Sequence, residues 1–145
     1  MPIRALEFRD IESILTIQLA CPEIAQWTSW DYERVAKGEM AGWVFEEDGE
    51  QLGFLIGRRV VADMEILNFA VRADARRKGT GDQLLQSALI WAASFSAEQV
   101  ILEVRSANET ALRFYERHKF HIAGRRRNYY SSPDDDALLL TLRLD

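Results

Sequence analysis

Cysteine and histidine are both scarce in this chain of 145 residues, which contains one cysteine, Cys21, and two histidines, His118 and His121. A single cysteine excludes a disulfide framework within the chain and a zinc site built from cysteines. Two histidines are too few for most metal sites of proteins. We therefore expect a protein that binds no metal and is suited to a reducing cytoplasm.

Long hydrophobic runs and an excess of positive charge are also absent. The first residues, MPIRALEFRD, carry charges where a signal peptide has an apolar run. The longest uncharged stretch, residues 83–97, is interrupted by Gln and Ser and is too short to cross a bilayer. The formal net charge of -5 opposes nonspecific binding to nucleic acid and favours a basic partner. These features predict a soluble cytoplasmic protein that binds neither a membrane nor nucleic acid directly.

Hydrophobic residues, by contrast, are plentiful. They make up 48% of the chain and charged residues make up 28%, a balance typical of a globular protein with a real core. The length fits one ordinary domain, residues 1–145, and the sequence shows no repeats or linkers.

Hydrophobic periodicity and turn residues predict alternating strands and helices. From about residue 60 the order β-α-β-α-β requires parallel pairing through crossover helices, whereas the hairpins require antiparallel pairing. We therefore expect an α/β (α+β) fold with a mixed sheet and helices on both of its faces. The expected strands are residues 3–8, 43–45, 51–59, 60–71, 100–104, 120–126 and 137–144, and the expected helices are 11–20, 30–37, 81–96 and 108–117, the first two capped by Asp10 and Ser29.

A cationic loop that contains two glycines, Arg76-Arg77-Lys78-Gly79-Thr80-Gly81, lies between an expected strand and an expected helix. Glycine permits a tight turn and a close approach of the backbone to a ligand. The free N–H groups of the helix start and the cationic side chains suit a phosphate, although a plain turn beside a solvated basic cluster is the alternative. The Gly-Lys-Ser/Thr of a Walker loop is absent, and Leu84 replaces the third small residue of a dinucleotide fingerprint.

Glu103 interrupts the apolar strand that begins Val100-Ile101-Leu102. Burying a carboxylate is costly unless it is paired, hydrated or at an edge. Glu103 could pair with Arg105 or point into solvent, or it could act as a general base in a cleft that water reaches. Asn108 is a plausible cap of the next helix, and Tyr115 follows nearly two turns later on the same helix face. Tyr115 by itself would be interpreted as an aromatic residue packed on the sheet.

These features together resemble the GNAT acyltransferase superfamily, and within it the RimI-type ribosomal-protein alanine N-acetyltransferases. The resemblance covers nearly the whole chain. It implies the GNAT fold, a mixed and mostly antiparallel sheet of six to seven strands flanked by about four helices, in which a splayed parallel strand pair forms the acetyl-CoA cleft. The segments that carry the resemblance are EILNFAV (65–71), RRKGTG (76–81), LEVRSAN (102–108), Tyr115 and NYY (128–130).

The resemblance also implies roles for the residues at matching positions. The backbone of residues 69–71 would bind the pantetheine arm of acetyl-CoA and polarise the thioester carbonyl, and the amides of residues 77–82 would hold the pyrophosphate. Glu103 would accept a proton from the attacking amine and Tyr115 would donate one to the leaving thiolate, so that transfer is direct and needs no metal. The implied cofactor-binding residues are Phe69, Ala70, Val71, Arg76, Arg77, Lys78, Gly79, Thr80, Gly81, Asp82 and Asn108.

Two positions raise questions about this assignment. Glu65 is a rival for the role of base, because other branches of the superfamily use an acid on that strand. Lys119 stands where the family usually has a glycine after the tyrosine helix, so this helix must end without a glycine cap.

The resemblance implies acetyl transfer to a protein N-terminal α-amine, that of the N-terminal alanine of the eighteenth protein of the small ribosomal subunit. The alternatives are acetylation of another protein or of a small amine, and a CoA-binding domain without turnover. The acidic balance and the Asp134-Asp135-Asp136 run predict a basic N-terminal peptide as the partner.

Overall fold

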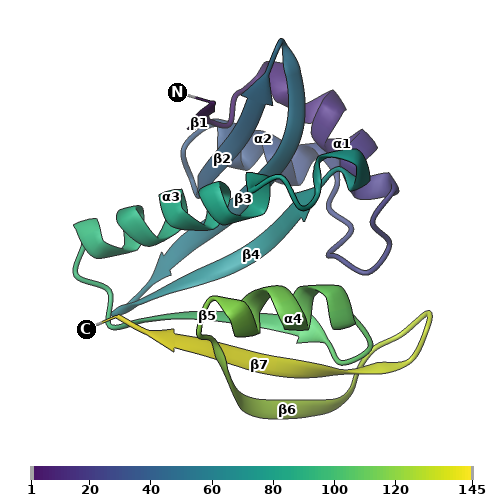
Figure 1. Cartoon of the computed structure of the whole chain (residues 1–145), viewed down its shortest axis with the longest axis vertical. Helices are drawn as coiled ribbons and strands as arrows, with labels where there is room; N and C mark the ends of the chain where they lie inside the picture. The colour runs from purple at the N-terminus through teal and green to yellow at the C-terminus, as the bar shows by residue number, and fades with distance from the viewer. Residues whose placement is uncertain (1, 145) are drawn as a thin grey trace.

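The computed structural model describes residues 2–144 (Figure 1). Met1 and Asp145, the two ends of the expected domain, lie outside the described residues. The elements follow in the order β1 (Ile3–Ala5), η1 (Phe8–Asp10), α1 (Ile11–Leu19), α2 (Ser29–Ala36), β2 (Ala41–Glu47), β3 (Glu50–Val60), β4 (Asp63–Val71), η2 (Ala73–Ala75), α3 (Thr80–Ser94), β5 (Gln99–Arg105), α4 (Glu109–Arg117), β6 (His121–Tyr130) and β7 (Asp135–Arg143).

Within residues 2–144 the strands form one seven-stranded sheet in the order β1-β2-β3-β4-β5-β7-β6. Neighbouring strands are antiparallel except for β4 and β5, which run parallel because α3 crosses over between them. The predicted fold class is therefore confirmed, since the sheet is mixed, mostly antiparallel and accompanied by four α-helices.

The parallel pair is short and then splits. β4 and β5 pair at Asp63 with Gln99, at Met64 with Val100 and at Glu65 with Ile101. Beyond these positions β4 stays paired with β3, and β5 stays paired with β7. Figure 1 shows the two strands starting together at one end of the sheet and diverging toward the other. The later part of β4 therefore has no strand to pair with on the side that faces β5.

The core lies in two layers, one on each face of the sheet. Alternate strand residues point to opposite faces, so Leu55 packs in the layer that contains α3, and Phe54 packs in the layer that contains α1 and α2. Figure 1 shows α3 and α4 in front of the sheet, with α1 and α2 behind it. Leu84 of α3 is fully buried, and truncating such a leucine to alanine costs about 2–5 kcal/mol.

Two expected strands are too long, and the strand expected over residues 120–126 is too short, since β6 continues to Tyr130. The strand expected over residues 3–8 ends at Ala5, because Phe8 belongs to the 3₁₀ helix that precedes α1. The strand expected over residues 60–71 begins at Asp63, because Val61 adopts a positive φ of 55° in a turn between β3 and β4. Neither turn contains a glycine or proline, so turn chemistry did not reveal them.

Two expected helix caps are also wrong. Thr28, and not Ser29, caps α2, because its hydroxyl accepts from the Asp31 N–H at 3.2 Å while the Asp31 carboxylate accepts from the Thr28 N–H at 2.8 Å. Asp10 precedes α1 but makes no side-chain cap there. Its carboxylate instead accepts from both Arg4 Nη atoms, at 2.8 and 2.7 Å, in a buried ion pair.

Candidate active site

Two cavities open where β4 and β5 separate. The basic cavity, of about 490 Å³, lies between the end of β4, the loop before α3 and the face of α4. The Glu103 cavity, of about 480 Å³, lies between the facing parts of β4 and β5 and the segment after β6. The cavities adjoin, because the same residues line both: Glu23, Ile24, Phe69, Asn108, Ala111 and Tyr115.

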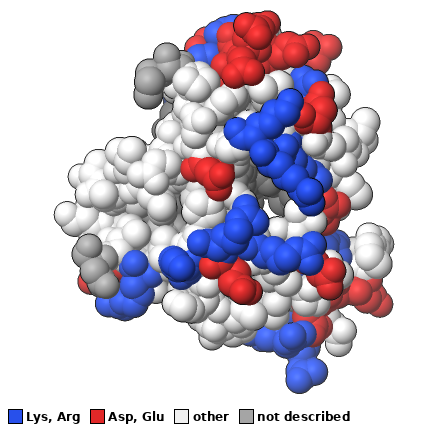
Figure 2. Space-filling view, in the orientation of Figure 1, with Lys and Arg blue, Asp and Glu red and all other residues white. Residues whose placement is uncertain are grey.

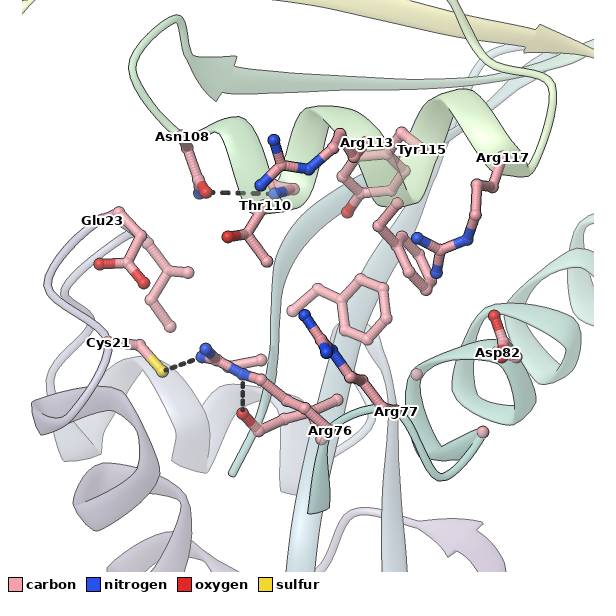
Figure 3. A pocket seen from close by; sticks show the side chains of 18 residues that line it. Cys21, Glu23, Arg76, Arg77, Asp82, Asn108, Thr110, Arg113, Tyr115 and Arg117 are labelled. Atoms are coloured by element: carbon pink, nitrogen blue, oxygen red, sulfur yellow. Dashed lines mark hydrogen bonds between the residues drawn. The ribbon is translucent and has the colours of Figure 1, made fainter. Parts of the chain in front are cut away.

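The structure brings most of the expected cofactor-binding residues together around the basic cavity, of which Figure 3 is a close view. Lys78 and Thr80 do not line it: Lys78 is exposed, and Thr80 is buried at the start of α3. The expected residues that do line it are Phe69, Ala70, Val71, Arg76, Arg77, Gly79, Gly81, Asp82 and Asn108.

The loop before α3 has the geometry of an anion site. Gly79, at the N-cap position, has a φ of 83° and supplies no capping side chain, so the first N–H groups of α3 are left without an intrahelical partner. A Cβ on Gly81 would lie 3.2 Å from Phe114 Cε1, so the absence of a side chain lets α4 lie against the helix start. Arg77 also adopts a positive φ, 64°, which is uncommon outside glycine.

The unpaired edge of β4 forms another wall of both cavities. The Phe69 N–H donates to the side-chain Oδ1 of its neighbour Asn68 at 3.2 Å. Residues 69–71 thus reach the cavities through a strand edge that can accept a further hydrogen-bonding partner.

Helix α4 is fixed at both ends of the basic cavity. Asn108 caps its start, since Asn108 Oδ1 accepts from the Ala111 N–H at 3.2 Å. At its other end Lys119 takes a φ of 72° without being a glycine. His118 Nε2 lies 2.6 Å from Asp82 Oδ1, which ties the end of α4 to the first turn of α3. The helix end itself is closed by the backbone, because the Phe120 N–H donates to Tyr115 O at 3.0 Å while Lys119 takes the conformation that glycine has in the family.

Tyr115 lines both cavities and is itself buried, with 6% of its surface exposed. Its ring packs edge-on against Phe69, Phe114 and Phe120, with centroids 6.3, 5.3 and 5.1 Å away. Burial raises the pKa of Tyr115 above its ordinary value, because the phenolate would be desolvated. The hydroxyl therefore stays protonated at neutral pH, as a proton donor must.

Glu103 lines the Glu103 cavity but not the basic cavity. Its partner is Arg126 of β6, whose Nε lies 3.5 Å from Glu103 Oε2. The alternative that Glu103 pairs with Arg105 is wrong, because the Arg105 guanidinium donates to Pro133 O at 2.9 Å. Oε2 is the one buried side-chain atom among residues 2–144 that has no hydrogen-bond partner. A buried oxygen without a partner is costly in a structural role and marks a candidate functional group.

Glu65 also lines the Glu103 cavity, so the structure keeps both candidate bases in one place. Its carboxylate, however, accepts from Arg58 Nε at 3.0 Å and lies 2.9 Å from Arg58 Nη2. Two nitrogens of the Arg58 guanidinium thus contact one oxygen of Glu65, whereas Arg126 lies 3.5 Å from Glu103 Oε2 and forms no hydrogen bond with it. This difference favours Glu103 as the proton acceptor.

Sequence reasoning missed two groups of cavity residues. One is the segment between α1 and α2, which contributes Cys21, Glu23 and Ile24 to the basic cavity. A polar network holds this segment in place, and no local sequence pattern predicts that the segment reaches the cavity. The other group lies on α4, where Thr110, Arg113 and Arg117 recur at helical spacing and could have been recognised as one face.

The polar network that holds the segment between α1 and α2 is buried beside β4. The Tyr32 hydroxyl donates to Gln18 Oε1 at 2.5 Å, and Gln18 Nε2 donates to Trp27 O at 2.8 Å. Asn68 of β4 donates from Nδ2 to Tyr32 Oη at 3.0 Å and to Ala25 O at 3.1 Å. The wall of the Glu103 cavity is thereby fastened to the strand that splits from β5.

Charge is distributed unevenly over the face that carries the basic cavity. Figure 2 shows Lys and Arg side chains gathered in a band across the middle of this face, over the starts of α3 and α4, while acidic side chains gather at the end where the β2–β3 hairpin lies. The cavity therefore attracts anions although the whole chain has a net charge of -5.

The split parallel pair, the glycine-containing start of α3 and the two adjoining cavities, with Tyr115 on the wall of both, form the arrangement that the resemblance implied for an acyl-CoA-dependent transferase. The sequence profile of the Acetyltransferase (GNAT) family matches residues 8–120, and the chain belongs to this family. GNAT acetyltransferases use acetyl-CoA as the acetyl donor.

Similar proteins come from bacteria, archaea and a plant. The chain is 33% identical, over 66% of each chain, to the ribosomal protein bS18-alanine N-acetyltransferase of Escherichia coli. A crystal structure of the E. coli enzyme superposes with a TM-score of 0.86 at 26% identity, covering 99% of this chain and 93% of that one. An N-alpha-acetyltransferase of Sulfurisphaera tokodaii is 30% identical, over 94% of this chain and 90% of its own. NAA60 of Arabidopsis thaliana in complex with acetyl-CoA shares the fold, with a TM-score of 0.88 at 20% identity, over 98% and 97% of the two chains. The chain is thus a GNAT N-acetyltransferase related to both groups of enzymes.

Residues 2–144 contain no group of three or more His, Cys, Asp or Glu side chains placed to hold a metal ion. In that part of the chain no helix is both long and apolar enough to span a bilayer.

Proposed function

We propose that this chain uses acetyl-CoA to acetylate the N-terminal α-amine of proteins. One observation carries the proposal: Glu103 and Tyr115 flank the split between β4 and β5, with Glu103 in one cavity and Tyr115 lining both. This arrangement suits an amine that enters from the Glu103 cavity and a thioester that enters from the basic cavity.

Glu103 acts as the general base in this mechanism. An amine is mostly an ammonium ion at neutral pH and is not nucleophilic until it loses a proton. Glu103, directly or through a water molecule, takes that proton, which frees the nitrogen lone pair for attack on the thioester carbon. Glu103 then releases the proton to solvent through the open cavity.

Residues 69–71 and the loop before α3 orient the donor. Bound acetyl-CoA supplies an acetyl group activated as a thioester. A backbone N–H of the free β4 edge donates to the thioester oxygen, where negative charge develops. The first-turn amides of α3, with Arg76 and Arg77, hold the pyrophosphate. Asn108, already at the cap of α4, lies on the wall between the two substrates.

Tyr115 acts as the general acid. As the bond between carbon and sulfur breaks, Tyr115 donates its hydroxyl proton to the CoA thiolate. The nitrogen loses a second proton as the amide forms, and this proton restores the Tyr115 hydroxyl. The reaction therefore yields the acetylated amine, CoA and one proton released to solvent, with no covalent enzyme intermediate.

The proposed acceptor is the N-terminal alanine of the small-subunit ribosomal protein bS18, in a cytoplasmic enzyme that acts as a single domain of residues 1–145. The similarity to the E. coli enzyme supports this acceptor, and the net charge of -5 supports a basic peptide. The similarity to archaeal N-alpha-acetyltransferases supports a second candidate, the N-terminal amine of another protein.

The test measures CoA release and product mass with acetyl-CoA and synthetic peptides. A peptide with the free N-terminal alanine of bS18 should be acetylated once at its α-amine, and the same peptide with a formylated N-terminus should not react. Transfer to a small amine but to no peptide would contradict the proposed acceptor. If the protein binds acetyl-CoA but releases CoA no faster than spontaneous hydrolysis of the thioester does, it would be a CoA-binding domain without turnover.

A further inference from the structure

Four arginines line the basic cavity, two from each of two facing elements. Arg76 and Arg77 belong to the loop before α3, and Arg113 and Arg117, here called the helix arginines, belong to α4. Figure 3 shows Arg77 and Arg117 reaching into the space between the two elements, Arg113 lying along α4 toward Thr110, and Arg76 directed toward Cys21. Among residues 2–144 none of the four forms an ion pair.

The contacts that these arginines do make are with neutral groups. Arg76 donates from Nε to Val71 O at 3.2 Å and from Nη2 to Cys21 Sγ at 3.5 Å. Arg117 stacks over the Phe114 ring, 5.6 Å from its centroid. Of the two acids on the cavity wall, Asp82 is engaged by His118 at 2.6 Å. The cavity therefore keeps an uncompensated positive charge.

The helix arginines repel each other, although the helix dipole favours Arg117 in the last turn of α4. They are four residues apart on one face of α4, where like charges repel and destabilise a helix. In a chain with a net charge of -5, this pair is explained by a negatively charged ligand that lies between it and the loop.

Pyrophosphate alone does not account for both pairs. The amides at the start of α3 and the loop arginines already supply the donors that a pyrophosphate uses. CoA carries one more anionic group, the 3′-phosphate of its ribose, and a phosphomonoester has a charge of about −1.5 to −2 near neutral pH. Thr110, on the same face of α4 and on the cavity wall, adds a hydroxyl donor.

We propose that Arg113 and Arg117 bind the 3′-phosphate of CoA and make this protein discriminate CoA from dephospho-CoA. The inference rests on the proposed use of acetyl-CoA, and it assigns to α4 a specificity role separate from that of Tyr115. Guanidinium groups form charge-assisted hydrogen bonds with phosphate, so the discrimination depends on these two side chains and weakens with salt.

The experiment measures binding of CoA and of dephospho-CoA by calorimetry, with no need for turnover. Wild-type protein should bind CoA about tenfold more tightly, a difference that corresponds to about 1.4 kcal/mol. The double variant Arg113→Gln/Arg117→Gln should lose about tenfold in affinity for CoA and less than about twofold for dephospho-CoA. Its thermal unfolding, followed by circular dichroism, should stay close to that of wild type, because no ion pair is removed and the lost contact of Arg117 with the Phe114 ring is offset by relief of the repulsion between the two arginines.

The matched control is Arg127→Gln/Arg143→Gln, which removes the same charge from exposed positions on β6 and β7 that lie outside both cavities, and it breaks no ion pair seen among residues 2–144. This control should bind both ligands as wild type does. Equal binding of the two ligands by wild type, an equal loss for both ligands in the helix variant, or the same loss in the control would each overturn the inference. Discrimination without acetyl transfer would contradict the proposed function alone, and a failure to bind CoA at all would contradict both.

Discussion

Arg58 Nη2 lies 2.9 Å from Glu65 Oε1, and this ion pair distinguishes Glu65 from Glu103, the two candidate bases on the wall of the Glu103 cavity. Glu65 has a guanidinium partner within hydrogen-bond distance, whereas Glu103 Oε2 is buried with no hydrogen bond. An amine that enters the cavity therefore meets Glu65, which is hydrogen-bonded to Arg58, and Glu103, whose ion pair with Arg126 at 3.5 Å leaves Oε2 without a hydrogen bond.

The first prediction compares the two acids directly. Glu103→Gln keeps the shape of the side chain and removes its basicity, so turnover should fall by about 100- to 10,000-fold, the usual contribution of a general base. Affinity for acetyl-CoA should change by no more than a few fold, because Glu103 does not line the basic cavity. Glu65→Gln should retain turnover within about tenfold. Steady-state kinetics of both variants measure the two losses of turnover. A larger loss in Glu65→Gln than in Glu103→Gln would assign the role of base to Glu65.

The second prediction concerns the proton donor. Tyr115→Phe keeps the packed ring and removes the proton, so turnover should fall by about 100- to 10,000-fold while acetyl-CoA still binds. Because burial raises the pKa of Tyr115 above its ordinary value of about 10, the wild-type rate should show no alkaline decline below about pH 10. A pH–rate profile checks this, and a decline between about pH 8 and 9 that disappears in the Phe variant would contradict the raised pKa.

The third prediction uses the contact between α3 and α4. Gly81→Val should weaken acetyl-CoA binding strongly, because even a Cβ at this position would lie 3.2 Å from Phe114 Cε1 and displace α4 from the helix start. Gly79→Ala is the informative companion, because its Cβ would meet no atom within 4 Å but its φ of 83° suits glycine. That change should lower the free energy of unfolding by about 1 kcal/mol. Calorimetric binding and chemical denaturation separate the two effects. Unchanged acetyl-CoA affinity in a folded Gly81→Val protein would contradict the placement of the pyrophosphate.

The fourth prediction concerns stability away from the cavities. Burial of Asp10 opposes its ionisation, yet the hydrogen bonds from Arg4 hold the pKa of Asp10 below its ordinary value. A depressed folded-state pKa contributes stability above the unfolded pKa of about 3.9, and this stability is lost as the pH falls through the folded value. Asp10→Asn should therefore lower the free energy of unfolding by about 2 kcal/mol near pH 7 and by less near pH 3, which lies below the unfolded pKa. Urea denaturation at the two pH values measures the difference, and an equal loss at both would contradict the ionic role.

Much of the fold follows from local patterns in the sequence. The crossover order after residue 60 requires one parallel pair, and the alternation of apolar residues places Leu55 and Phe54 on opposite faces. The sequence patterns do not predict where that pair splits. The position depends on whether β5 forms its backbone hydrogen bonds with β7 or with β4, which are distant from each other in the sequence. The location of the cavities therefore came from the resemblance and from the structure, and not from periodicity.

The partners of the site residues were harder to predict than the residues themselves. Glu103 stands out in an apolar strand, but its partner Arg126 is brought close by the order β5-β7-β6, while the nearby Arg105 turns to the loop before β7. The link from Gln18 through Tyr32 to Asn68 likewise joins three separate elements. Such contacts depend on tertiary packing, which no single window of sequence contains.

The short pairing of β4 with β5 has a mechanical consequence. Three residue pairs form the only ladder that the structure describes between the first four strands and the last three. The sheet therefore consists of two subsheets that are joined by one short stretch of backbone pairing. A ligand that lies in the split and contacts both subsheets would stabilise their association, and its binding would make their unfolding more cooperative. Amide hydrogens of β5 and β7 should then exchange independently of those of β3 in the free protein, and together with them once CoA is bound.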